Sequence, residues 1–216
     1  MRQTVMKTIA ESKLITIVRG LGPEPMGKLA EALYRGGIRM IEVTFDQSKP
    51  EHWKDTAAAI RLILNKFKGV VLAGAGTVMT QEQLKIAHEA GAQYIISPNV
   101  DEGIIKKTRE LGLVSLPGAL TPTEIVAAHA YGADIVKVFP AGDLGPGYIK
   151  AIKAPLSHIQ LMAVGGVSEK NATDFIKAGA IGLGVGGNLV NKEWIAAGEF
   201  KRITELAKEY GNAVKG

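Results

Sequence analysis

Short apolar runs alternate with longer amphipathic segments along the whole chain. The runs are rich in Val, Ile and other residues that favour strands, whereas the longer segments repeat apolar residues at helical spacing, as in residues 26–33. Several of the longer segments end in glycine, which stops a helix before the next run begins. The pattern predicts eight strands, over residues 14–19, 40–45, 70–75, 94–97, 114–117, 135–139, 159–164 and 181–185.

Strands and helices follow one another at intervals of roughly 20 to 30 residues, which is typical of a parallel sheet with right-handed crossovers. Eight such units predict an α/β fold, the (β/α)8 TIM barrel. An open, doubly wound sheet is the alternative, but all strands look equally buried, which favours the barrel. Residues 4–11 predict an extra N-terminal helix that could plug the bottom of the barrel. Residues 1–216 contain no linker, so we expect a single barrel domain.

The composition narrows the class of protein. The chain has 216 residues, 46% of them hydrophobic, and no cysteine, which excludes disulfides, thiolate metal sites and a cysteine nucleophile. The four histidines lack metal-ligand spacing, so no metal is expected. Because signal, membrane-spanning and basic–aromatic segments are missing, we expect a cytoplasmic protein that binds neither membrane nor nucleic acid. The net charge of +5 would suit small anionic substrates.

Lys137 stands inside the apolar run 134–140, which predicts a buried strand. A lysine in such a place reaches solvent with its end, pairs with an acid, or loses its proton more readily than usual. A neutral lysine amine is a nucleophile that attacks ketones to form a Schiff base. Lys137 is therefore a candidate nucleophile, and a strand-end lysine that simply reaches solvent is the alternative.

Glu42 lies in the middle of the predicted second strand. Alternation along that strand directs Ile41 and Val43 toward the helices and Glu42 toward the barrel interior. A buried carboxylate is unfavourable unless it is paired. Glu42 could therefore form a structural ion pair with Arg19 or Lys137, although a Lys–Glu pair inside a barrel is also a signature of an active site.

The carboxyl ends of barrel strands carry the chemistry in this fold class. Arg19 ends the first predicted strand, and Pro98 follows the fourth. The third strand ends in small residues, 74–76, followed by the hydroxyl of Thr77, an arrangement that would let a ligand approach the backbone. These strand ends predict one side of a substrate pocket, with ordinary loop turns as the alternative.

Glycine pairs follow the seventh and eighth predicted strands, Gly165 with Gly166 and Gly186 with Gly187. Each pair leads into a predicted helix, the first of which we expect Ser168 to open. Two such turns after these strands are the usual phosphate site of a barrel, because backbone N–H groups and the helix dipole bind the anion.

Six short motifs resemble those of one known family. In chain order they are Glu42-Val43-Thr44, Gly74-Ala75-Gly76-Thr77, Ile96-Ser97-Pro98, Leu116-Pro117-Gly118, Lys137-Val138-Phe139-Pro140 and Gly165-Gly166-Val167. They are similar to the 2-keto-3-deoxy-6-phosphogluconate / 4-hydroxy-2-oxoglutarate (KDPG/KHG) aldolase family over nearly the full chain. The resemblance implies a class I aldolase on a trimeric (β/α)8 barrel, a lyase that cleaves KDPG to pyruvate and glyceraldehyde 3-phosphate in Entner–Doudoroff metabolism, and possible action on 4-hydroxy-2-oxoglutarate.

The same resemblance implies a role for each candidate residue. Lys137 would form the Schiff base, so that the covalent imine replaces a cofactor, and Glu42 would be the general acid/base. Residues that would bind the substrate are Arg19, Thr77, Pro98, Phe139 and Val164, and those that would bind its phosphate are Gly165, Gly166, Gly186 and Gly187. The partners implied are a phosphorylated keto acid, pyruvate and further copies of this chain.

Three positions depart from the pattern of many gluconate-type members. Val164 stands where they have Thr, as in the branch that acts on 2-keto-3-deoxy-6-phosphogalactonate, and residues 145–150 also look like that branch. Asp46 replaces an Arg found in some members, and Gly187 replaces a Ser that contacts phosphate. Residues 121–124 look like the gluconate branch. Phosphogalactonate aldolase is therefore the alternative activity.

Two further functions fit the same residues less well. A phosphosugar isomerase or epimerase would use the same glycine turns for phosphate, but it would not form an imine with pyruvate. A binding barrel without activity is disfavoured, because Lys137 and Glu42 would then be unused charges inside strands.

Overall fold

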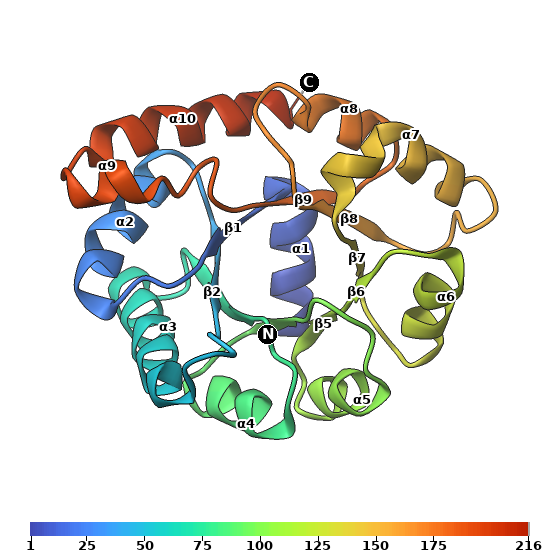
Figure 1. The fold of residues 1–216 in the computed structure, drawn as a ribbon, viewed down its shortest axis with the longest axis horizontal. Coiled ribbons are helices and arrows are strands. Elements are labelled where there is room, and N and C mark those ends of the chain that lie inside the picture. The colour runs from blue at the N-terminus through green and yellow to red at the C-terminus, as the bar shows by residue number, and fades with distance from the viewer. Residues whose placement is uncertain (216) are drawn as a thin grey trace.

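The structure is a computed structural model that describes residues 1–215, and these form a parallel α/β barrel ringed by helices (Figure 1). The strands hydrogen-bond side by side in the order β5-β4-β3-β2-β1-β9-β8-β7-β6, and every ladder is parallel. The strand segments are β1 (Leu14–Val18), β2 (Met40–Thr44), β3 (Leu72–Gly76), β4 (Tyr94–Ile96), β5 (Val114–Leu116), β6 (Gly118–Ala119), β7 (Val136–Val138), β8 (Leu161–Val164) and β9 (Gly182–Val185). The predicted TIM-barrel class is confirmed.

The fifth predicted strand is divided in two at Pro117. β5 pairs with β4, whereas β6 pairs with β7. Proline has no N–H to donate, so one ladder cannot run through this residue. Its carbonyl accepts a hydrogen bond from the N–H of Lys137 at 2.9 Å, and the carbonyl of Ser115 accepts one from Asp134 at 3.0 Å. The segment therefore changes partner at Pro117 and bridges the two edges of the sheet.

Helices cover the outside of the ring (Figure 1). They are α2 (Pro23–Arg35), α3 (Trp53–Phe67) after a 3-10 turn η1 (Pro50–His52), α4 (Gln81–Glu89), α5 (Glu102–Glu110), α6 (Pro122–Ala130), α7 (Ala141–Lys153), α8 (Ala172–Lys177), α9 (Lys192–Ala196) and α10 (Phe200–Ala213). Outward strand residues and inward helix residues form one large apolar core between the two layers. No helix of residues 1–215 is long and apolar enough to cross a membrane.

Two of these helices begin with a capping box. The Thr80 hydroxyl accepts the N–H of Gln83, and the Gln83 side chain accepts the N–H of Thr80. Thr121 and Glu124 make the equivalent pair at the start of α6. A capping box satisfies donors that the first turn of a helix would otherwise leave unpaired. In these two boxes Gln and Glu therefore perform the same local task.

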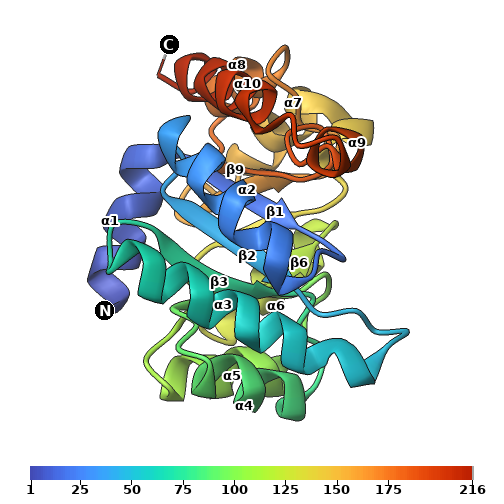
Figure 2. The same ribbon diagram turned by 90° about the vertical axis from the view of Figure 1, so that its left-hand side faces the viewer.

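The predicted N-terminal helix is present as α1 (Arg2–Ser12), and it lies at the end of the barrel opposite the loop that joins β2 to η1 (Figure 2). Val5 and Ile9 are fully buried in a second apolar cluster inside the barrel. The buried members of this cluster are Val5, Ile9, Ile15, Met40, Leu72, Tyr94, Ile96, Val114, Leu116, Ile135, Met162 and Val164. The helix therefore plugs the amino end of the barrel and leaves the carboxyl end for ligands.

Candidate active site

A pocket of about 370 Å³ opens at the carboxyl ends of the strands. All the residues predicted to be catalytic, to bind substrate or to bind phosphate line it. They are Arg19, Glu42, Thr77, Pro98, Lys137, Phe139, Val164, Gly165, Gly166, Gly186 and Gly187. The structure thus brings together residues that come from seven parts of the chain, as expected where parallel strands end at one rim.

Lys137 lies in the middle of β7 and points into the barrel. Its neighbours Val136 and Val138 belong to the outer core, so alternation directs the lysine inward. The residue is only 7% exposed, and its Nζ lies 4.7 Å from the ring centroid of Phe139. Burial lowers the pKa of Lys137; Glu42 opposes this effect and Arg19 adds to it. Lys137 is therefore not a lysine that reaches solvent, and its neutral amine is easier to form.

Glu42 occupies the facing position on β2, where Ile41 and Val43 pack outward as predicted. The residue is 2% exposed, and its Oε2 has no hydrogen-bond partner among residues 1–215. Its carboxyl group lies directly over Gly76, where an added Cβ would come within 1.7 Å of Oε1. Any side chain at position 76 would therefore displace the carboxylate, which explains one of the small residues at the end of β3.

The electrostatics of these two groups mirror each other. Burial raises the pKa of Glu42, while Lys137 and Arg19 oppose that rise. The two groups influence each other, yet in the described part of the chain no ion pair within 4.0 Å joins them. Each neutral form is thus favoured relative to its value in water. An amine and a carboxyl group held this way can exchange protons with a bound molecule, so a purely structural ion pair does not account for them.

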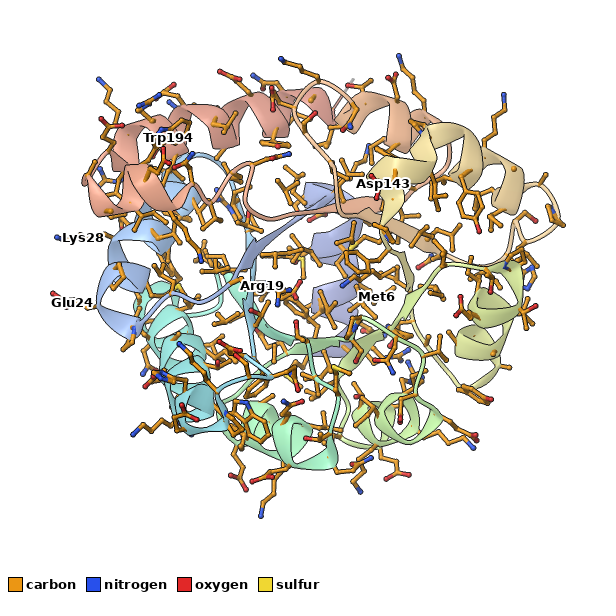
Figure 3. The ribbon with its side chains drawn as sticks, in the orientation of Figure 1. Met6, Arg19, Glu24, Lys28, Asp143 and Trp194 are labelled. Carbon is orange, nitrogen blue, oxygen red and sulfur yellow. The ribbon has the colours of Figure 1, made fainter. Side chains whose placement is uncertain are left out.

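Arg19 and Thr77 form the polar rim of the pocket. Nη2 of Arg19 donates a hydrogen bond to Oγ1 of Thr77 at 3.4 Å. Figure 3 shows Arg19 near the middle of the ring, whereas Glu24 and Lys28 on α2 point away from it. The guanidinium is exposed, so it can contact a carboxylate or phosphate that enters the pocket. Thr77 offers a hydroxyl beside it.

Apolar groups line other parts of the pocket. Val164 is 4% exposed and packs over Gly184 on the neighbouring strand β9. Phe139 is 40% exposed and stands beside the Lys137 amine. Pro98, two residues after the end of β4, also lines the pocket. An apolar lining around a buried lysine excludes water, which supports the desolvation that lowers its pKa.

The glycine turns line the pocket, but the helices that follow them begin later than predicted. Ser168 does not open a helix: its N–H donates to the Asn171 side chain, and α8 begins at Ala172. The second short helix, α9, begins at Lys192. Side-chain hydrogen bonds of Asn171 close a turn first, which the sequence pattern did not indicate. The anion-binding capacity of the two turns therefore rests on backbone N–H groups rather than on an adjacent helix dipole.

Four lining residues were missed from the sequence: Ile17, Val167, Gly184 and Asn188. Asn188 directly follows the Gly186–Gly187 pair, and its side chain donates to the carbonyl of Val167 at 2.9 Å. Its place after a glycine pair was a usable signal. In residues 1–215 no group of three or more His, Asp or Glu side chains is placed to hold a metal ion.

Comparison with known proteins decides the family. The family model for KDPG and KHG aldolase matches residues 5–206. The chain belongs to the KDPG and KHG aldolase family. This aldolase is therefore a lyase that cleaves carbon–carbon bonds, and the candidate pocket lies within the matched residues.

The relatives of this aldolase include both branches that its motifs resemble. A probable 2-dehydro-3-deoxy-6-phosphogalactonate aldolase of Rhizobium meliloti is 37% identical over 89% of this chain and 88% of its own. The KHG/KDPG aldolase of Escherichia coli K12 is 35% identical over 97% of both chains. The two identities are close, so overall similarity does not separate the branches.

Solved structures give the same result for the fold. A native KDPGal structure superposes with a TM-score of 0.84 at 32% identity, covering 94% of each chain. The KDPG aldolase of Legionella pneumophila, solved with pyruvate captured as a covalent carbinolamine, superposes with a TM-score of 0.83 at 28% identity. It covers 93% of this chain and 95% of its own.

Proposed function

We propose that this aldolase cleaves 2-keto-3-deoxy-6-phosphogluconate to pyruvate and glyceraldehyde 3-phosphate through a Schiff base on Lys137. The observation that carries the proposal is the buried lysine of β7, whose pKa is lowered by desolvation beside an unpaired carboxyl group. Cleavage of 4-hydroxy-2-oxoglutarate would use the same groups. No separate cofactor is needed in this reaction, because the imine itself accepts electrons.

The reaction begins when the neutral Lys137 amine attacks the C2 ketone. Glu42 gives a proton to the resulting hydroxyl, which leaves as water and yields the protonated imine. Glu42, now ionised, takes the proton of the C4 hydroxyl, directly or through water. The C3–C4 bond breaks, its electron pair moves into the imine to form an enamine, and the aldehyde leaves. Return of the proton to C3 and hydrolysis of the imine release pyruvate and regenerate the amine.

The rest of the pocket would hold the substrate along its length. Arg19 and the Thr77 hydroxyl supply donors suited to a carboxylate. The turns at Gly165–Gly166 and Gly186–Gly187 supply backbone N–H groups for the phosphate. Phe139, Pro98 and Val164 would pack against the carbon chain.

Borohydride trapping tests the nucleophile. Pyruvate with borohydride should add one reduced adduct, and peptide mapping should place it on Lys137. Lys137→Arg should acquire no adduct and show no cleavage, because a guanidinium stays protonated and cannot attack. Labelling of another lysine, or none, would falsify the assignment. It would also favour an isomerase or epimerase, whose enediol chemistry does not pass through an imine.

The galactonate epimer is the second candidate substrate. Val164 and the relative from Rhizobium meliloti favour it, whereas the KHG/KDPG relative favours the gluconate epimer. Steady-state kcat/KM values for both epimers, measured side by side, would decide which reaction this enzyme performs best.

The proposed assembly is a cytoplasmic homotrimer that acts in the Entner–Doudoroff route. Three exposed apolar side chains, Leu120, Val126 and Leu144, lie on or just before α6 and α7 and support burial between subunits. Phosphorylated sugar acids are metabolites of the cell interior, which supports the location. Sedimentation equilibrium would test the trimer, and a monomer at micromolar concentration would contradict it.

A further inference from the structure

Thr77 has an unusual backbone conformation at the rim of the pocket. It directly follows β3 with φ +56°, in the left-handed region. Left-handed backbone is uncommon for any residue with a side chain and rarer for a β-branched one. The Thr77 side chain lines the pocket and accepts the hydrogen bond of Arg19. Neighbouring groups must therefore hold this residue in place.

A chain of two glutamine side chains reaches Thr77 from outside the pocket. Nε2 of Gln47, in the loop after β2, donates to the carbonyl of Thr77 at 2.8 Å. Nε2 of Gln83, on α4, donates to Oε1 of Gln47 at 2.9 Å. Oε1 of Gln83 accepts the N–H groups of Met79 at 2.7 Å and Thr80 at 3.2 Å. Gln83 is fully buried, whereas Gln47 is exposed at the surface.

The backbone groups at the two ends of this series of hydrogen bonds determine which amide atoms donate and which accept. Backbone N–H groups can only donate, so Oε1 of Gln83 must be the atom that faces Met79 and Thr80. That leaves Nε2 of Gln83 to donate to Oε1 of Gln47. The Gln47 amide is then oriented with Nε2 toward Thr77, whose carbonyl can only accept. Each amide therefore has one permitted orientation, and the capping box of α4 is connected to the rim of the pocket.

We propose that Gln47 is a positioning residue, which holds Thr77 so that its hydroxyl and Arg19 face the keto acid. Gln47 itself does not line the pocket, and it is not a catalytic residue. This inference rests on the proposed function, because it concerns the same site. Gln47 acts on substrate binding through Thr77, and the proton transfers of Lys137 and Glu42 do not depend on it.

Gln47→Glu removes the donor without changing the size of the side chain. A carboxylate still accepts from Gln83, but it places an acceptor against the acceptor of Thr77. We expect the KM for the keto acid to rise by about fivefold to tenfold, the effect of about one net hydrogen bond. The kcat value should stay within about threefold of wild type, and the pH profile of kcat should keep its shape.

Gln83→Glu removes the hydrogen bond from Gln83 to Gln47 while it keeps the capping box. Glu124 performs that capping task at α6, so a glutamate at position 83 can accept the same two N–H groups. It cannot donate to Gln47. The same rise in KM is expected in the folded variant, and thermal stability should fall because the new carboxylate is fully buried. The double substitution Gln47→Lys with Gln83→Glu should restore KM, because an ammonium group can donate to both the new carboxylate and Thr77.

Ser48→Ala is the matched control, because Ser48 lies on the same loop and, within residues 1–215, its side chain hydrogen-bonds only to Asp46. It should leave KM unchanged. If the wild type is active and both glutamate variants keep its KM, the positioning role of Gln47 is overturned and the proposed function still stands. A wild type that neither cleaves the keto acid nor forms the borohydride adduct refutes the proposed function instead, so the two failures are distinguishable. A fall in kcat with KM unchanged would also overturn the positioning role.

Discussion

The two ends of the barrel place buried charges in opposite situations. Asp134 precedes β7 at the amino end of the barrel, where its side chain is 3% exposed and pairs with Arg2 and Arg109. It also accepts the N–H of Ser115 at 2.9 Å. Lys137 lies three residues further along the chain and faces Glu42, whose Oε2 has no partner in the described residues. One carboxylate is fully satisfied, and the other is buried without a partner.

The difference separates structural charges from functional ones. A paired, hydrogen-bonded carboxylate such as Asp134 ties α1 and α5 to the bottom of the barrel. An unpaired buried carboxylate opposes folding, because it loses hydration and gains no partner. Glu42 is therefore best explained by a demand other than stability. The comparison predicts that a substitution of Glu42 mainly lowers activity, whereas a substitution of Asp134 mainly lowers stability.

The largest effect is expected for Glu42→Gln. The amide keeps the shape of the carboxyl group but cannot transfer a proton, so kcat should fall by about two to four orders of magnitude. Folding stability should be at least that of the wild type, because a buried charge is removed. Adduct formation with pyruvate would show that the binding site survives. A variant within a few-fold of wild-type kcat would make Glu42 a structural residue and remove the contrast between the two ends.

Asp134→Ala should show the opposite division. It removes the acceptor of two arginines and of the Ser115 N–H, so the free energy of unfolding should fall by about 3 kcal/mol. Denaturation with urea would measure this, while kcat per folded molecule should stay within about twofold. Asp55→Ala is the control, because its pairing with His52 is exposed and should change stability by about 1 kcal/mol or less. Equal losses in both variants would contradict the comparison.

The pH dependence of stability sharpens the same contrast. Burial raises the folded-state pKa of Glu42 above its ordinary value of 4.5, so the folded protein binds this proton more tightly than the unfolded chain. The associated stability is complete below pH 4.5 and is lost as pH rises through the raised pKa, by at most about 1.4 kcal/mol per pH unit. The free energy of unfolding of Glu42→Gln, measured in urea, should therefore increase relative to that of wild type as pH rises. A constant difference would mean that Glu42 has an ordinary pKa.

A smaller effect, confined to one substrate, is expected at the phosphate turns. Gly187 suits this test because an added Cβ would meet nothing within 4 Å, whereas Gly166 has φ +72° and packs against Gly142. Gly187→Asp should raise the KM for phosphorylated substrate by about tenfold or more through charge repulsion. The KM for 4-hydroxy-2-oxoglutarate, which has no phosphate, should change little. Gly187→Ala is the uncharged control, and equal losses on both substrates would exclude a phosphate role.

The smallest effect is expected for Val164→Thr. The new hydroxyl could make one hydrogen bond to a substrate hydroxyl or carboxylate, and a neutral hydrogen bond contributes about 0.5–1.5 kcal/mol. The ratio of kcat/KM values should shift toward the gluconate epimer by a few-fold to about tenfold. An unchanged ratio would locate epimer selectivity elsewhere, such as near Arg19 or Asp46.

The sequence was sufficient to predict features that depend on local patterns. Strand alternation placed Glu42 inside the barrel and Ile41 outside, and the rule that chemistry lies at strand ends brought Arg19 and Thr77 into one pocket. These predictions succeeded because a parallel barrel repeats one simple relation between sequence and position.

Features that depend on a distant partner could not be predicted. The division of the fifth strand at Pro117 follows from which neighbour each half contacts, and α8 begins late because Asn171 closes a turn. The link between Gln47 and Gln83 spans 36 residues and leaves no periodic signal. Such side-chain contacts become visible only when the elements that carry them are assembled.

The helix that plugs the barrel has a consequence for the order of assembly. α1 precedes every barrel strand in the sequence, yet several of its partners come from the second half of the chain, since Arg2 binds Asp134 and Ile9 packs near Gly182 on β9. Its docked position is therefore incomplete until β9 has left the ribosome. Until then Val5 and Ile9 stay exposed on a nascent helix, and contacts of such long sequence separation form slowly. α1 is thus made before the strands that it plugs and completes its docking only after them.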